Sequence, residues 1–434
     1  MPTATRLAMG AAIVAATAVV YWRAVFAYFY EDDFQWLASR LVFHPAELLR
    51  FGSYSHFYRP VIELYFWMAA PLFAGSPLLF HLANVALHAV NGLLVFVLVR
   101  TFTGSDRHGF LAALFFVVLP AYIEAVAWVG ALAEPVTTFF VCLSIHGFVQ
   151  WRRGRGAAWQ ALSLLTFWLG LMTHESAVMI LPLLVLAEWT VVDRDDRGWR
   201  RAVLRFAPYA ALLAVYLAID IPINRRSYLV GEGYYRPGIH AVRNLLDYVI
   251  SLYVGKRNAA SHAGVALVLA ALLVKGTPRV RFATAWMILT LLPFLSFTWG
   301  NTSRYAYTPA VGFAMLLAEG VEWLDRFLSR WTVYRPRASG ARIRAVVVTA
   351  VAAFLTIRFM GFAMKGSANF AARTEPYRQF VTALRAAHPT LPPGSTVEVD
   401  PAIDARLHHA YLESLVRWHY QDPTITVVVA SRLP

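Results

Sequence analysis

The sequence predicts an all-α protein that crosses a membrane many times and ends in a small α/β tail domain outside the bilayer. Hydrophobic residues make up 59% of the 434 residues, charged residues make up 15%, and the mean hydropathy is +0.52. Soluble domains do not have this composition. Apolar runs long enough to cross a hydrocarbon core of roughly 30 Å recur along almost the whole chain. The bilayer is therefore the solvent for most side chains.

About eleven apolar windows are predicted as membrane-spanning helices. The first is interpreted as a retained span, not a cleaved secretory signal, because similar runs follow it repeatedly. The windows are residues 7–27, 79–99, 108–121, 134–150, 158–172, 177–192, 206–221, 262–274, 282–297, 306–323 and 345–362.

The charges of the connections between these windows set an orientation. The net charge of +14 would suggest a nucleic-acid partner in a soluble protein, but none is expected here, because the arginines lie in alternate short loops. Loops rich in Arg and Lys remain in the cytoplasm. They include Arg100 and Arg107, the Arg152–Arg155 region, residues 194–205, residues 275–281 and residues 326–344.

The remaining connections then share the outer face of a bacterial cytoplasmic membrane. Residues 1–362 are predicted to form a transmembrane domain with long outer loops at 28–78 and 222–261. Residues 363–434 are predicted to form a small extracytoplasmic domain, in which "STVEVD" and "TITVVVA" indicate strands and "HHAYLESLVRWHY" indicates a helix.

Three carboxylates, Glu31, Asp32 and Asp33, directly follow the first span. Adjacent carboxylates repel one another and raise at least one pKa unless cations face them, which suits a general base. The alternative is a solvated helix N-terminus with acidic residues near the positive end of the helix dipole.

The next charged stretch, "SHFYRPVIE", contains His56, Tyr58 and Arg59 ahead of Pro60. An arginine can bind a phosphate through two hydrogen bonds, and a histidine can donate to a third oxygen. The alternative is anchoring at the lipid headgroups, which is common for Tyr and Arg.

The segment "HLANVALHAVNG" places His81, Asn84, His88 and Asn91 on one face of one span. Polar groups that faced lipid would be costly, so this face is expected to point into the bundle. His81 and His88 are two helical turns apart, about 10 Å, too far to share one metal ion. Hydrogen bonding between helices is favoured over metal binding.

Three outer span ends carry further ionisable groups: Glu124, the pair His174 and Glu175, and Arg304. Because these groups recur at one side of the membrane, they predict a shared polar cavity there. Each alone could be a helix cap or an interfacial side chain. The chain has no P-loop, dinucleotide fingerprint, HExxH motif or nucleophile elbow, so a soluble nucleotide donor is not expected.

Six motifs now occur in a recognisable order: the acidic pair, "FYRP", "HLANVALHAVNGLLVF", "IEAVAWV", "THESAVMILP" and "SRYAYTPAVGF". Together they resemble the GT-C superfamily of polyprenyl-phosphate-sugar-dependent glycosyltransferases. The likeness is greatest to the membrane half of the transmembrane, TPR-containing O-mannosyltransferases and their bacterial relatives. It covers roughly residues 1–325. The TPR array of those enzymes is not present in this chain, and "THES" stands where they often have a Lys-Glu pair.

The resemblance implies an inverting glycosyltransferase with its active site on the outer face. The donor would be a sugar on a polyprenyl phosphate, and the acceptor a hydroxyl of a glycan, lipid or protein. Asp32 or Asp33, with Asp32 preferred, would be the general base. Residues expected to bind the donor phosphate are Arg59, Arg304, His56 and His174. Supporting residues would be Glu31, Tyr58, Glu124, Glu175, His88, Asn84 and Tyr305. No cofactor is required, and a divalent metal is left open.

Two other classes of protein remain as alternatives. A transporter or flippase of a lipid-linked glycan would also have an inward polar face, although transporters commonly show paired halves, and no internal repeat is found. An acyl- or phosphoethanolamine-type transferase is the third class; the latter would need a larger soluble domain than the tail provides.

Overall fold

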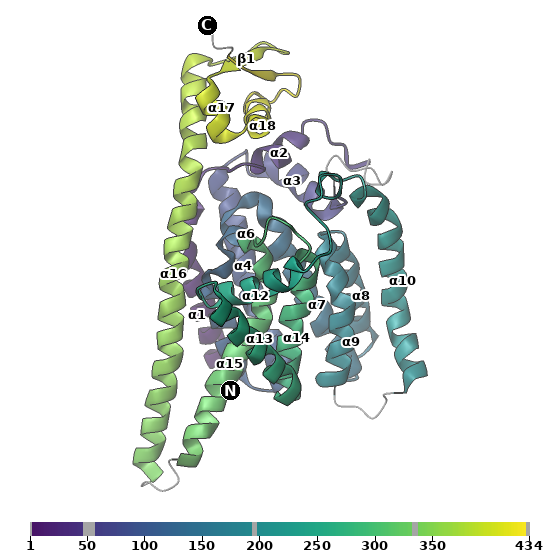
Figure 1. The fold of residues 1–434 in the computed structure, drawn as a ribbon, viewed down its shortest axis with the longest axis vertical. Helices are drawn as coiled ribbons and strands as arrows, with labels where there is room; N and C mark the ends of the chain where they lie inside the picture. Colours follow the sequence, from purple (N-terminus) through teal and green to yellow (C-terminus); the bar gives the residue numbers. More distant parts are fainter. Residues whose placement is uncertain (1, 47–56, 193–197, 332–336, 431–434) are drawn as a thin grey trace.

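The computed structural model describes residues 2–46, 57–192, 198–331 and 337–430, which form a bundle of helices with a small unit at one end (Figure 1). The helices are α1 (Thr3–Tyr21), α2 (Asp33–Ser39), α3 (Pro60–Leu72), α4 (Pro77–Thr103), α5 (Asp106–Val118), α6 (Ile123–Ala127), α7 (Ala133–Arg152), α8 (Ala157–Leu171), α9 (Ile180–Thr190), α10 (Trp199–Asn224), α11 (Tyr228–Gly231), α12 (His240–Leu252), α13 (Ala259–Lys275), α14 (Pro278–Leu291), α15 (Tyr307–Trp331), α16 (Arg337–Ala387), α17 (Pro401–Leu407) and α18 (His409–Tyr420). The strands are β1 (Thr396–Val399) and β2 (Thr426–Val429).

Each of the eleven apolar windows coincides with a helix, but the count of eleven spans is not confirmed. Within the described residues, five helical stretches are long and apolar enough to cross a bilayer: α1, α4, Val129–Arg152, α10 and Ser339–Ala387. A sixth results if α5 and Pro120–Ala127, which meet at a bend of 44°, are counted as one span. The other windows correspond to helices of 11 to 17 residues, α8, α9, α13 and α14, or to α15, whose second half is charged.

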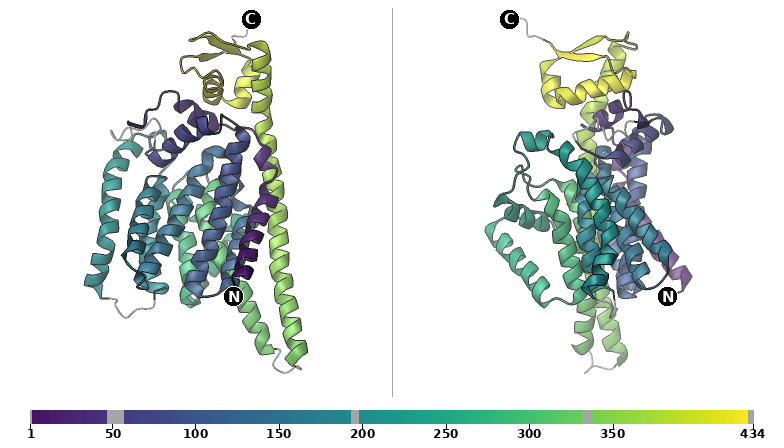
Figure 2. Two further views of the ribbon diagram at one scale, coloured as in Figure 1. Left: turned by 180° about the vertical axis from the view of Figure 1, so that it is seen from behind. Right: turned by 90° about the vertical axis from the view of Figure 1, so that its right-hand side faces the viewer.

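Helix α16 has 51 residues and runs along the whole bundle and past its end (Figures 1 and 2). At about 1.5 Å per residue it is roughly 75 Å long. It continues without a break through residues 362 and 363, where the sequence predicts a domain boundary. The polar residues after Gly361 therefore belong to the same helix as the apolar residues before it.

The tail after α16 contains one two-stranded parallel sheet, β1 with β2, and the helices α17 and α18. An apolar cluster joins this tail to the end of the bundle. Phe34 and Leu37 of α2 lie in the same buried cluster as Tyr377 of α16 and Leu412 of α18. Apolar contact therefore fixes the tail against α2, and a second, larger core fills the bundle itself.

The polar face of α4 points into the bundle and hydrogen-bonds to neighbouring segments, as the sequence predicts. His88 Nδ1 lies 2.7 Å from the hydroxyl of Tyr307, and Asn91 Nδ2 donates to the same hydroxyl at 3.1 Å and to the carbonyl of Pro135 at 2.8 Å. Asn84 donates to the carbonyl of Trp128 at 3.2 Å. These bonds connect α4 to α7 and α15.

Removing the hydroxyl of Tyr307 should destabilise the bundle. In the Tyr307→Phe variant, both His88 Nδ1 and one bond of Asn91 lose their partner in a buried site, which costs about 1–3 kcal/mol. We expect a lower thermal unfolding midpoint in detergent. The matched control is Tyr65→Phe, because the buried Tyr65 hydroxyl makes no hydrogen bond with any described residue. Equal midpoints for the two variants would show that the Tyr307 hydroxyl does not stabilise the fold.

Candidate active site

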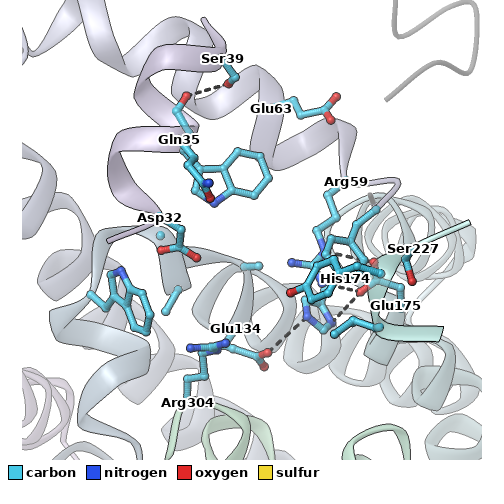
Figure 3. Close-up of a pocket in the computed structure, with 18 of the residues that line it drawn as sticks. Asp32, Gln35, Ser39, Arg59, Glu63, Glu134, His174, Glu175, Ser227 and Arg304 are labelled. Carbon is cyan, nitrogen blue, oxygen red and sulfur yellow. Dashed lines mark hydrogen bonds and ion pairs between the residues drawn. The ribbon is translucent and has the colours of Figure 1, made fainter. Parts of the chain in front are cut away.

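A cavity of about 720 Å³ lies at the end of the bundle that carries α2, α3 and the tail. Segments from distant parts of the chain line it, including α2, the start of α3, residues 128–134, residues 174–176, residues 227–230, residues 293–305 and α18. Figure 3 shows several of its ionisable side chains: Asp32 lies on one side, Arg59, His174 and Glu175 lie on the other, and Glu134 and Arg304 lie between them. The shared polar cavity expected from the sequence is thus present.

The acidic turn, residues 31–33, places the side chains of Asp32 and Asp33 in different surroundings. Glu31 has a φ of 45°, in the left-handed region, and this turns the chain sharply before α2. Asp33 is fully buried, and its Oδ2 and Oδ1 accept the backbone N–H groups of Tyr30 at 2.8 Å and Gly130 at 2.5 Å. Burial, reinforced by the charge of Asp32, raises the pKa of Asp33. Asp33 does not line the cavity, and its side chain connects two loops.

Asp32 lines the cavity. It precedes α2, but its side chain makes no capping hydrogen bond, unlike the solvated helix N-terminus considered as the alternative. Its Oδ1 is buried and has no hydrogen-bond partner among the described residues. Burial raises the pKa of Asp32 to about 6, and the guanidinium groups of Arg304 and Arg59 limit this rise.

Gly130 allows this close approach of the acidic turn. A Cβ atom at this position would lie 2.5 Å from Asp32 Oδ1 and 3.0 Å from Asp33 Oδ1. Any side chain here would therefore displace one of the two carboxylates, so glycine is required for the arrangement.

Two arginines supply positive charge. Arg59 makes two hydrogen bonds to Glu175, from Nε at 3.1 Å and from Nη2 at 2.8 Å. The guanidinium of Arg304 lies over the rings of Trp128, at 5.0 Å, and Tyr305, at 5.1 Å. Arg304 forms no ion pair with any residue in the described part of the chain, so its charge is available to a ligand.

His174 is neutral and has a defined tautomer. Its Nδ1 accepts the backbone N–H of Ser176 at 3.1 Å, which places the proton on Nε2. Burial, together with the charge of Arg59, lowers the pKa of His174 to about 3. Glu175 behaves in the opposite way: burial opposes its ionisation, but Arg59 lowers its pKa to about 2. The "THES" motif therefore contributes an uncharged imidazole and a carboxylate that is paired with Arg59.

Several expected site residues do not line the cavity. Glu124 pairs with Arg373 of α16 at 3.5 Å, and Tyr58 lies in the apolar core of the bundle. His88 and Asn84 serve the helix contacts described above, and Glu31 forms the turn. Tyr305 does line the cavity, and its ring stacks on Phe294 at 4.2 Å. His56 lies outside the described residues.

The sequence analysis missed Glu134, Trp128 and Gly130. Glu134 is the first residue of a predicted span, and an ionisable residue in an apolar window is itself a signal for a functional site. Trp128 donates from Nε1 to the Tyr30 carbonyl at 3.1 Å and supports Arg304, but nothing in its sequence context distinguishes it from other aromatic residues. Within residues 2–46, 57–192, 198–331 and 337–430, no three His, Cys, Asp or Glu side chains are placed to bind one metal ion.

The arrangement of the helices gives this chain a fold that is shared with two solved proteins. ArnT from Cupriavidus metallidurans, solved with undecaprenyl phosphate, superposes with a TM-score of 0.55 over all of this chain and 87% of its own, at 14% identity. The archaeal oligosaccharyltransferase AglB from Archaeoglobus fulgidus, solved with an inhibitory peptide and a dolichol-phosphate, gives a TM-score of 0.53 over 84% of this chain and 56% of its own, at 15% identity.

Sequence similarity is weaker and local. Protein O-mannosyl-transferase TMTC3 is 28% identical over 157 residues in the mouse protein and 25% identical over 178 residues in the human protein. These matches cover 33% and 37% of this chain but only 17% and 19% of the relatives. No protein-family model matches the chain. The resemblance inferred from the six motifs is thus confirmed in the fold.

The two aspartates should differ in their effects on stability. In Asp33→Asn, the amide cannot accept both backbone N–H groups, and we expect a loss of about 1–3 kcal/mol in the free energy of unfolding. Asp32→Asn should lose nothing, because it removes a carboxylate with an unpartnered buried oxygen. Denaturant unfolding in detergent would measure both. A larger loss for Asp32→Asn would show that Asp32 supports the turn.

Proposed function

We propose that this protein is an integral-membrane glycosyltransferase that moves a sugar from a polyprenyl phosphate to an acceptor hydroxyl with inversion of configuration. The observation that carries the proposal is that one cavity gathers a carboxylate with a raised pKa, Asp32, and two guanidinium groups, Arg59 and Arg304, from distant segments. ArnT with undecaprenyl phosphate and AglB with a dolichol-phosphate, two proteins of the same fold, support a lipid phosphate as donor.

The first step of the mechanism is proton removal. With a pKa of about 6, Asp32 is mostly ionised at pH 7 yet is a stronger base than an exposed aspartate. It accepts the proton of the acceptor hydroxyl as that oxygen attacks the anomeric carbon.

The second step is departure of the lipid phosphate. The bond between the anomeric carbon and the phosphate oxygen breaks on the face opposite the attack, and its electron pair remains on that oxygen. Arg304 and Arg59 stabilise the growing negative charge. Arg304 is the stronger candidate because it is free of ion pairs with the described residues, whereas Arg59 is partly neutralised by Glu175. This scheme requires no cofactor, and it neither requires nor excludes a divalent metal ion.

The orientation follows from the arginine-rich loops. The last residues of α15 and the first residues of α16 lie at the end of the molecule opposite α2, α3 and the tail (Figure 1). We place this end in the cytoplasm and the cavity on the outer face of a bacterial cytoplasmic membrane. Residues 1–362 then carry the reaction, and residues 363–434 cover the cavity through Tyr411, Ser414 and Arg417 of α18.

The experiment that tests this function uses purified protein in detergent, where transport has no meaning. The protein is incubated with undecaprenyl-phosphate sugars and candidate glycan, lipid and peptide acceptors, and release of free undecaprenyl phosphate is measured. We expect acceptor-dependent release by the wild type and a rate about 10²- to 10⁴-fold lower for Asp32→Asn. The matched control is Asp400→Asn, since Asp400 caps α17 outside the cavity. Full activity of folded Asp32→Asn would refute Asp32 as the base.

The pH profile offers an independent check. Because the base must be deprotonated, kcat/KM should rise with pH around a midpoint near 6, not near 4. Arg304 lowers the pKa of Asp32, so Arg304→Gln should shift the midpoint to higher pH, whereas Arg304→Lys, which keeps the charge, should shift it less. A midpoint that does not move in Arg304→Gln would contradict the electrostatic contact between the two groups.

A further inference from the structure

Glu134 is a buried carboxylate that lines the cavity, and its oxygens accept no hydrogen bond from any described residue. It lies in the first turn of α7, its side chain is 2% exposed, and it lines the cavity. Neither of its carboxylate oxygens has a hydrogen-bond partner among the described residues. Nε2 of His174 lies 3.5 Å from Oε1 (Figure 3).

The fold does not account for this carboxylate. Glu188, which is equally buried, receives two hydrogen bonds from Arg152 at 2.7 and 2.9 Å, and Asp33 receives two from the backbone. Glu134 contributes only its backbone carbonyl, which accepts the hydroxyl of Thr138 at 3.0 Å. A buried carboxylate without donors lowers stability. Its presence is explained if a ligand brings the missing donors.

The surroundings define the chemistry of that ligand. A carboxyl group accepts hydrogen bonds at both oxygens when ionised and still accepts when protonated, so in either state a ligand with O–H or N–H groups supplies the missing donors. Arg59 and Arg304 line the same cavity and exert their charge on Glu134. If these arginines bind the lipid phosphate, the sugar attached to that phosphate has hydroxyl groups within a few ångströms, beginning with the carbon next to the anomeric carbon.

We propose that Glu134 is a sugar-recognition residue that accepts hydrogen bonds from hydroxyl groups of the lipid-linked sugar. This inference rests on the proposed function, in which Arg59 and Arg304 bind the phosphate of the donor, and it assigns the sugar of the donor to Glu134. Because these hydroxyl groups leave with the sugar, Glu134 distinguishes a lipid phosphate that carries a sugar from one that does not.

The test compares a lipid phosphate without a sugar with the same lipid phosphate carrying one of three sugars. Dissociation constants are measured in detergent for undecaprenyl phosphate and for undecaprenyl-phosphate-linked mannose, glucose and arabinose. For the sugar lipid that the wild type binds most tightly, Glu134→Ala should weaken binding about 10- to 100-fold. Binding of undecaprenyl phosphate, which carries no sugar, should be unchanged. Glu134→Gln, which keeps one acceptor, should be intermediate. The matched control is Glu319→Gln, a buried carboxylate 3.5 Å from His108 outside the cavity.

The outcomes separate this inference from the proposed function. If the wild type binds and transfers a panel sugar but Glu134→Ala weakens both ligands equally, or neither, sugar recognition by Glu134 is refuted and the transferase stands. If the wild type binds none of these lipids, both the sugar recognition by Glu134 and the proposed glycosyltransferase function are refuted. The thermal unfolding midpoint of Glu134→Ala should equal or exceed that of the wild type, because an unpartnered carboxylate has been removed. A lower midpoint would assign Glu134 to the fold and overturn the proposal.

Discussion

The backbone N–H groups of Tyr30 and Gly130 bind the carboxylate of Asp33, and the position of Asp32 depends on this contact. It connects the turn after α1 with the loop before α7, two segments about a hundred residues apart in sequence. A single turn of positive φ at Glu31 then places consecutive carboxylates in opposite environments, one inside the protein and one in the cavity. Adjacent residues of the same type thus acquire different chemistry from the backbone alone.

Burial and charge act against each other throughout the cavity. Exclusion of water raises the free energy of every charged group there, and the arginines offset this increase more for some carboxylates than for others. Glu175 receives two hydrogen bonds from Arg59 and remains ionised. Asp32 makes no hydrogen bond to Arg59 and interacts with it only through its charge, so Asp32 binds its proton more tightly. His174 loses its proton for the same reasons, because burial and positive neighbours both disfavour the imidazolium. One set of charges therefore produces a base, an ion pair and a neutral hydrogen-bond donor.

Sequence periodicity and charge gave the helical class, the clustering of ionisable groups at one end and the inward face of α4, because each depends on local patterns. The number of spans was not accessible, since it depends on where the chain bends, as between α5 and α6, and on how short helices such as α9 are covered by neighbours. Glu124 was misplaced as a cavity residue because its partner Arg373 lies about 250 residues away, on a helix whose continuation past residue 362 no local signal marks. Glu134 was overlooked since its isolation from donors exists only in three dimensions.

Because α16 is uninterrupted, it connects the bundle of helices rigidly to the unit whose helix α18 lines the cavity. The same rigid rod contacts α1 and α15 beside the bundle and carries the unit whose α18 packs on α2. Adding one residue to such a rod turns everything beyond it by about 100° and lifts it by about 1.5 Å. Length changes in α16 would therefore rotate Tyr411 and Arg417 out of the cavity wall unless they came in near-whole numbers of turns, and the spacing along this helix is as much a part of the site as any side chain in it.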